Sequence, residues 1–155
     1  MVIVAIRSRV IDLCIKYTGR CFSMKQIMVV AGDGKYQVRL DGFCTEGKGI
    51  CAFMTGGIRP HNGGTVVANP RLKSNAQTST DFTADIWVSG VPGHKDTEIG
   101  IPVAKILATK LNEAISLTVG IHIDHASKKE IEMLITNCKL AAERFIAEYQ
   151  KNQPD

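Results

Sequence analysis

Short hydrophobic segments bounded by turn-forming or polar residues run through much of the first ninety positions, which predicts β-strands. Five segments carry this pattern, at residues 27–31, 36–40, 49–55, 64–69 and 82–90. The Asp33-Gly34 pair between the first two is typical of a tight hairpin turn with positive φ angles. The polar stretch that separates the last two predicts an exposed connection.

From about Ile99 the hydrophobic period lengthens to that of a helix. We expect this helix to carry Pro102 in its first turn. Its predicted buried stripe comprises Val103, Leu107, Leu111 and Ala114. Residues 117–124 return to a strand pattern, and the segment from Ser127 to Glu130 matches a capping box that opens a second helix. The predicted buried side of that helix comprises Ile131, Leu134, Cys138, Ala142, Phe145 and Tyr149.

The order of these elements predicts an α+β fold. An antiparallel β-meander is followed by helix, strand and helix, with both helices packed on one face of the sheet. The length of 155 residues fits one domain, and we expect residues 24–150 to form a single ligand-binding unit. Residues 1–23 alternate only weakly and are predicted to be a peripheral segment, either a strand or a short helix.

Composition narrows the class of protein. The net charge is +4 without a long run of Lys or Arg, and aromatic residues make up 6% of the chain, so a nucleic-acid surface is not predicted. No apolar run reaches the ~20 residues of a membrane-spanning helix, and MVIVAI lacks the basic leader of a signal peptide. The cysteines form no CxxC pair, which favours free thiols in a reducing cytoplasm: Cys14, Cys21, Cys44, Cys51 and Cys138.

The first candidate site is the glycine-rich stretch TGGIRPHNGGT at residues 55–65. Arg59 and His61 lie two residues apart, and Gly57 and Gly63 on either side let the chain turn tightly and let a ligand approach backbone N–H groups. Arginine offers a planar fork for phosphate or carboxylate, and histidine can donate to the same anion. The simpler alternative is a connecting loop in which glycine serves geometry and Arg59 is merely solvated.

The second stretch, SGVPGHKDTEIG at residues 89–100, turns at Gly93 and enters a helix near Asp96. A helix N-terminus presents unpaired N–H groups to an anion, and His94 and Lys95 stand beside it. The alternative is that Asp96 or Thr97 simply caps the helix. The GxxxxGK[ST] spacing of a nucleotide-hydrolysing loop is absent.

The third stretch, GIHIDHAS at residues 120–127, follows the strand pattern. Alternate strand residues share a face, so His122 and Asp124 are predicted to point the same way. Such a pair can bind a ligand or transfer a proton, or it can simply close the sheet edge with a polar pair. No histidines show the HExxH spacing, so we expect no metal site, and the GxSxG elbow of a serine hydrolase is absent.

Three stretches of the chain resemble, in the same order, the corresponding stretches of the small prenylated-flavin chaperones: GGIRPHNGGTV, VSGVPGHKDTEIG and VGIHIDHASKKEIEML. These are the companion D proteins of gallate-type, UbiD-like decarboxylases. The likeness runs from Tyr36 to Tyr149, and the Gly-Gly-x-Arg-Pro-His element is its most specific part. It implies a fold similar to that of proteasome-assembly chaperones, often paired as a homodimer.

The resemblance also implies a role. It points to a carrier, not itself the decarboxylase, that binds prenylated flavin mononucleotide (prenylated FMN) as cargo and assists its delivery to, or maturation in, a UbiD-like decarboxylase. No catalytic residue is expected. The predicted cofactor-binding residues are Gly57, Arg59, His61, Gly63, Gly93, His94, Lys95, Asp96, His122 and Asp124. Two alternatives stay open: a small enzyme that uses the His122/Asp124 pair on an anionic substrate, and an assembly module without a small ligand.

Overall fold

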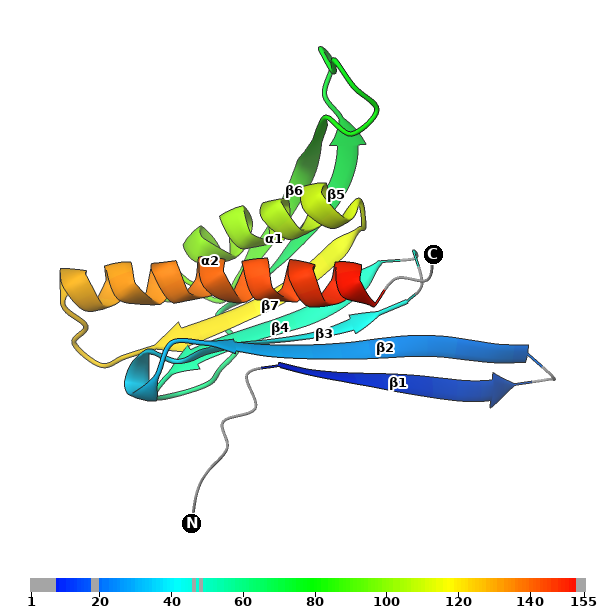
Figure 1. Cartoon of the computed structure of the whole chain (residues 1–155). Coiled ribbons are helices and arrows are strands. Elements are labelled where there is room, and N and C mark those ends of the chain that lie inside the picture. The colour runs from blue at the N-terminus through cyan, green and yellow to red at the C-terminus, as the bar shows by residue number, and fades with distance from the viewer. Residues whose placement is uncertain (1–7, 18–19, 46, 48, 153–155) are drawn as a thin grey trace.

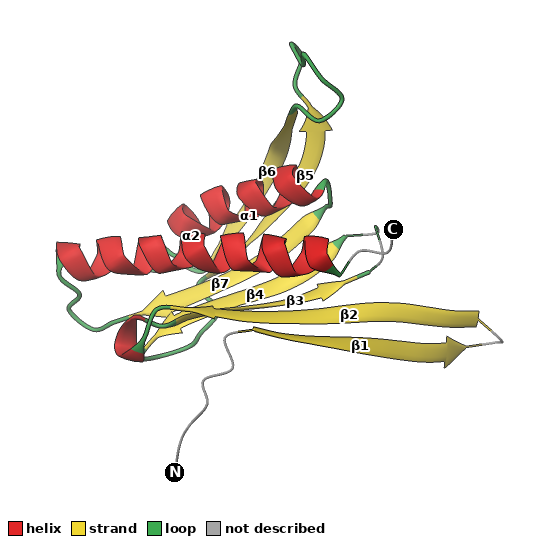
Figure 2. Ribbon diagram, in the orientation of Figure 1, coloured by secondary structure: helices red, strands yellow, loops and turns green. Residues whose placement is uncertain are grey.

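The computed structural model describes residues 8–17, 20–45, 47 and 49–152. They form one seven-stranded sheet with two helices on the same face (Figures 1 and 2). The strands are β1 (Ser8–Tyr17), β2 (Arg20–Ala31), β3 (Val38–Cys44), β4 (Ile50–Gly57), β5 (Gly64–Leu72), β6 (Phe82–Gly90) and β7 (Ile115–His122). The helices are α1 (Thr97–Leu111) and α2 (Lys128–Lys151), and a short 3-10 turn, η1, spans Gly34–Tyr36. The predicted α+β class is confirmed.

The sheet departs from a simple meander at β7. The strand order is β1-β2-β3-β4-β7-β5-β6, so β7 lies between β4 and β5, parallel to β4 and antiparallel to β5. The segment that connects β4 to β5 must therefore cross the end of β7. Local patterns do not predict this insertion, because it depends on pairs as distant in sequence as Ile50 and Ile115.

The core lies between the sheet and the two helices. Met54 of β4, Leu117 of β7, Leu107 of α1 and Phe145 of α2 are all fully buried there. Gly42 of β3 leaves the space that the Phe145 ring fills, since a side chain at that position would overlap the ring. The helices are thus seated closely on the sheet, which fixes the position of the loops at its ends.

α1 begins where the second candidate stretch predicts, near Asp96, but before the hydrophobic period becomes clear at Ile99, and it ends earlier than that period predicts. It begins at Thr97, so Pro102 is its sixth residue and not part of its first turn. Asn112 ends the helix with a left-handed φ of 54°, a conformation that asparagine tolerates. Leu111 is consequently only half-buried, and Ala114 is exposed beyond the helix and not part of its buried stripe.

α2 begins with the predicted capping box. The Ser127 hydroxyl accepts the N–H of Glu130, and the Glu130 carboxylate accepts the N–H of Ser127 at 2.8 Å. Ile131, predicted to be buried, is 47% exposed. At 100° per residue Ile131 shares the azimuth of the buried Cys138 and Tyr149, so its exposure comes from its place in the first helical turn, beyond the core.

The N-terminal strands pair as a hairpin, and β1 occupies one edge of the sheet. Where it is described, the weakly alternating segment is therefore a strand; residues 1–7 lie outside the described residues, and a peripheral role for residues 1–23 stays a prediction. After β2, Gly32 and Gly34 have φ angles of 75° and 56°, whereas Asp33 is extended. The predicted positive φ angle is thus confirmed for Gly34 and wrong for Asp33.

Three cysteine side chains are described. Cys44 and Cys138 are buried and Cys51 is exposed, all as free thiols. Burial raises the pKa of Cys44 and of Cys138 to about 12, so both thiols stay protonated at neutral pH. Of the helices that the structure describes, none has the length and apolar character needed to cross a bilayer.

Candidate functional site

The glycine-rich loop lies directly on the backbone of β7. The N–H of Ile58 donates to the His122 carbonyl at 2.8 Å, and the N–H of Gly63 donates to the Val119 carbonyl at 2.9 Å. These two bonds hold the ends of the crossing segment where β4 and β7, which are parallel, both finish (Figure 1). The carboxyl ends of neighbouring parallel strands are a common place for ligand sites in sheets with helices.

Glycine is required where the two backbones touch. A side chain at Gly57, whose φ is 77°, would overlap the backbone of His122. A side chain at Gly120 of β7 would likewise overlap the carbonyl of His61. These glycines are therefore needed to let the loop pass closely over β7, and this close contact holds the loop residues in place.

The crossing brings His61 to the loop that precedes α1. The Nε2 atom of His61 lies 3.0 Å from Nδ1 of His94, and the two rings are tilted, with centroids 4.7 Å apart. One carboxylate oxygen of Asp96, Oδ2, is 3.4 Å from His61 Nε2 and 3.5 Å from His94 Nδ1. Residues from two separate predicted stretches thus form one cluster.

Asp96 holds this cluster to β7. It occupies the N-cap position of α1, but its carboxylate makes no capping bond; instead Oδ1 accepts the N–H of Ile121 at 2.7 Å. The alternative in which the Asp96 side chain caps the helix is therefore wrong, because this carboxylate bonds to the strand instead. A side chain at Gly63 would overlap the Asp96 carboxylate, so this glycine makes room for it.

A second polar cluster adjoins the first. His122 Nε2 and Asp124 Oδ1 lie 2.8 Å apart, so these two side chains do point together, and Arg59 reaches the other oxygen of Asp124 at 3.0 Å. The hydrogen bond from His122 and then the charge of Arg59 lower the pKa of Asp124. The His122 ring stands edge-on to that of His61, with centroids 6.0 Å apart.

The remaining predicted residues lie around these clusters. Gly93 adopts a φ of 83° in the turn after β6, and Lys95 is exposed between His94 and Asp96. All three stretches therefore meet at one end of the sheet. That they bind a ligand stays a prediction.

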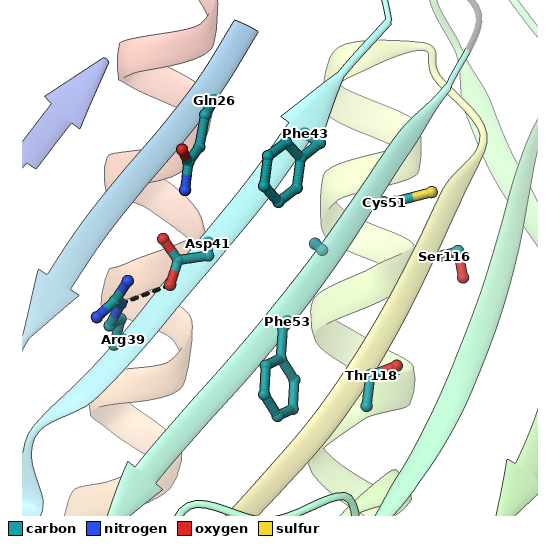
Figure 3. A pocket seen from close by; sticks show the side chains of 9 residues that line it. Gln26, Arg39, Asp41, Phe43, Cys51, Phe53, Ser116 and Thr118 are labelled. Carbon is teal, nitrogen blue, oxygen red and sulfur yellow. Dashed lines mark hydrogen bonds and ion pairs between the residues drawn. The ribbon is translucent and has the colours of Figure 1, made fainter. Parts of the chain in front are cut away.

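Sequence reasoning missed a second surface, on the sheet face that neither α1 nor α2 covers. Figure 3 shows a depression there, and its volume is about 400 Å³. It is lined by Gln26, Arg39, Asp41, Phe43, Cys51, Ala52, Phe53, Ser116 and Thr118. Phe43 and Phe53 are 40% and 41% exposed. The signal was their outward register, since each alternates with a buried strand residue.

A solved structure places the fold in a known class. The chain is similar to one described as the "Crystal Structure of a Novel Chaperone Complex for Yeast 20S Proteasome Assembly", with a TM-score of 0.53 and 11% identity over 83% of this chain and 96% of that chain. At this identity the likeness shows the fold alone: an α+β sheet of the assembly-chaperone type, as predicted.

Residues 32–150 match the family described as the prenylated flavin chaperone LpdD-like domain. The chain belongs to this family, which confirms the resemblance carried by the three stretches. Among curated proteins, no sequence match was found.

Proposed function

We propose that this protein is a non-catalytic carrier that binds prenylated FMN at the end of the sheet where β4 and β7 finish, and assists its delivery to, or maturation in, a UbiD-like decarboxylase. One observation supports this most: Arg59, His61, His94, Lys95 and His122, which come from three distant stretches, converge there, in a chain of a flavin chaperone family. The free thiols fit a cytoplasmic protein.

The chemistry of the clusters fits the parts of a flavin mononucleotide. Its phosphate needs cations, and Arg59 and Lys95 both have exposed side chains at this end of the sheet. Its ribityl hydroxyls and polar ring edge need donors and acceptors, which His122 and the Asp124 carboxylate supply. Ile58, 48% exposed beside Arg59, offers apolar surface to the ring.

A carrier must also release its cargo. Arg59 is already paired with Asp124, so binding a phosphate there exchanges one ion pair for another and does not create a new one. That exchange limits the net binding free energy, and every ~1.4 kcal/mol by which this free energy is weakened raises the dissociation constant tenfold. The arrangement favours moderate affinity.

Retention of the cargo tests the binding. We expect purified protein mixed anaerobically with prenylated FMN to retain the flavin through gel filtration. Arg59→Ala should weaken retention by up to about 10-fold, the low end for a charged hydrogen bond, because loss of the Asp124 ion pair on binding offsets part of the gain. Arg71→Ala is the matched control, because Arg71 is also an exposed arginine paired with one aspartate, Asp85 at 2.7 Å, on strands β5 and β6. Equal retention by the two variants, or none by the intact protein, contradicts the proposal.

Delivery is tested separately. Adding the flavin-loaded protein to an apo UbiD-like decarboxylase should raise decarboxylase activity, while the loaded protein alone should show none. Turnover by the protein alone would support the enzyme alternative. Binding without any rise in the activity of the partner would leave a flavin-binding protein but remove the delivery role.

We further propose that the protein is a homodimer through the uncovered sheet face. Four apolar side chains point to this face by strand register, and each is at least 36% exposed: Phe43, Phe53, Val67 and Trp87. Light scattering should give a dimer mass that Phe53→Asp reduces to a monomer. Ile131→Asp, at an equally exposed apolar residue on α2, should leave the dimer intact.

A further inference from the structure

Three ligand atoms surround one point between the glycine-rich loop and the start of α1. They are His61 Nε2, His94 Nδ1 and Asp96 Oδ2, and their mutual distances are 3.0, 3.4 and 3.5 Å. A tetrahedral metal ion with bonds of about 2.0–2.1 Å holds its ligand atoms about 3.3–3.4 Å apart. We propose that these three atoms bind one divalent transition-metal ion, a site that the sequence spacing did not predict.

Two of the three ligands are already oriented by outer hydrogen bonds. His61 Nδ1 lies 3.0 Å from the Arg59 carbonyl, which can only accept, so Nδ1 carries the proton and Nε2 presents its lone pair to the centre. The N–H of Ile121 holds Oδ1 of Asp96 and leaves Oδ2 turned to the two rings. Outer partners of this kind accompany metal ligands in proteins, because they fix the tautomer and the angle of approach.

A histidine–histidine hydrogen bond alone does not explain the cluster. His94 Nδ1 could donate to His61 Nε2, which accounts for the 3.0 Å distance. The Asp96 side chain, however, is 8% exposed, and its Oδ2 stands 3.4–3.5 Å from both rings. Charged hydrogen bonds to carboxylates are shorter, about 2.7–2.9 Å. A cation at the centre satisfies all three atoms once the proton on Nδ1 of His94 moves to Nε2 of the same ring, which frees Nδ1 as a ligand.

The donor set indicates the class of ion. Two imidazoles and one carboxylate suit zinc and its first-row neighbours better than magnesium or calcium, which prefer oxygen ligands. Three protein ligands leave at least one coordination position for water or an anion. His122 stays outside the set, because its Nε2 is bonded to Asp124.

Metal titration tests this site without any flavin. Tag-free, chelator-treated protein is titrated with Zn²⁺ by calorimetry and with Co²⁺ by visible absorption. We expect one equivalent of each metal and the intense d–d bands of a four-coordinate cobalt site. His94→Gln and Asp96→Asn should each lower the affinity by at least the roughly 10- to 100-fold that loss of an outer partner costs. In the Asp96→Asn variant the side-chain amide oxygen can still accept the Ile121 N–H, so this variant is expected to fold.

His125→Asn is the matched control. It removes one of the four histidines, tolerates the φ of 52° at that position, and leaves the three ligands in place. Full binding by this variant, with loss in the other two, supports the site. No binding by the intact protein, or equal affinity in all variants with circular dichroism unchanged, overturns it. Because flavin is absent throughout, neither result decides whether the protein carries prenylated FMN.

Discussion

Two buried carboxylates stand near opposite ends of β7, and they are used differently. Glu113, just before the strand, is 7% exposed; one of its oxygens accepts the N–H of Gly49 at 2.9 Å and the other the hydroxyl of Tyr149 at 2.9 Å. Asp96, beside the far end of the strand, has an 8% exposed side chain and one oxygen bound to a backbone N–H. Its other oxygen faces two histidines.

The difference separates a structural carboxylate from one that is available for chemistry. Both oxygens of Glu113 are occupied by neutral donors that tie Gly49 and the end of α2 to the start of β7. Asp96 has only one of its two carboxylate oxygens bonded to the backbone. Burial alone therefore does not mark a functional site; the nature of the groups that surround each oxygen does.

The largest expected effect is a loss of folding stability when Glu113, near the start of β7, is replaced. Glu113→Ala leaves the Gly49 N–H and the Tyr149 hydroxyl without this acceptor and should lower the free energy of unfolding by about 2–4 kcal/mol. Asp96→Asn keeps an acceptor for the Ile121 N–H and should cost less than about 1 kcal/mol. Urea denaturation of both variants measures the contrast, and equal losses would break the comparison.

An intermediate effect is expected where the loop crosses β7. Gly120→Ala places a methyl group against the His61 carbonyl and should cost about 1–3 kcal/mol, while moving His61 and weakening Zn²⁺ binding. Gly90→Ala is the control, since no atom lies within 4 Å of the added carbon. Thermal unfolding and zinc titration of the pair check the prediction. A Gly120→Ala protein as stable as Gly90→Ala would show that the contact is not tight.

The smallest effect is a shift in a single titration. His122→Ala removes the hydrogen bond that contributes most to the lowered pKa of Asp124, so this pKa should rise toward its ordinary value of 3.8. A carboxyl with a lowered pKa stabilises the folded state above its ordinary pKa, and that contribution disappears as the pH falls through the lowered value. In the variant this contribution should be smaller, and its loss should be complete at a higher pH. Carboxyl NMR titration measures it, with Arg59→Ala expected to give a smaller rise.

The sequence was a good guide to elements and a poor one to their pairing. A short hydrophobic segment was enough to place β5, alternation placed β6, and the Ser127–Glu130 capping box placed the start of α2, because each signal lies within one segment. The insertion of β7 between β4 and β5 has no local signal. For the same reason the sequence could name His61 and His94 as candidates but could not show that their rings touch.

The position of β7 ties the assembly of the candidate site to the completion of folding. Arg59 and the first two histidines are synthesised well before residues 115–122, yet the strand that the loop rests on is among the last to emerge. A nascent chain that ends before β7 carries the polar side chains without the support beneath them. On the carrier role proposed above, cargo would be accepted by the finished protein and not by its partly made form.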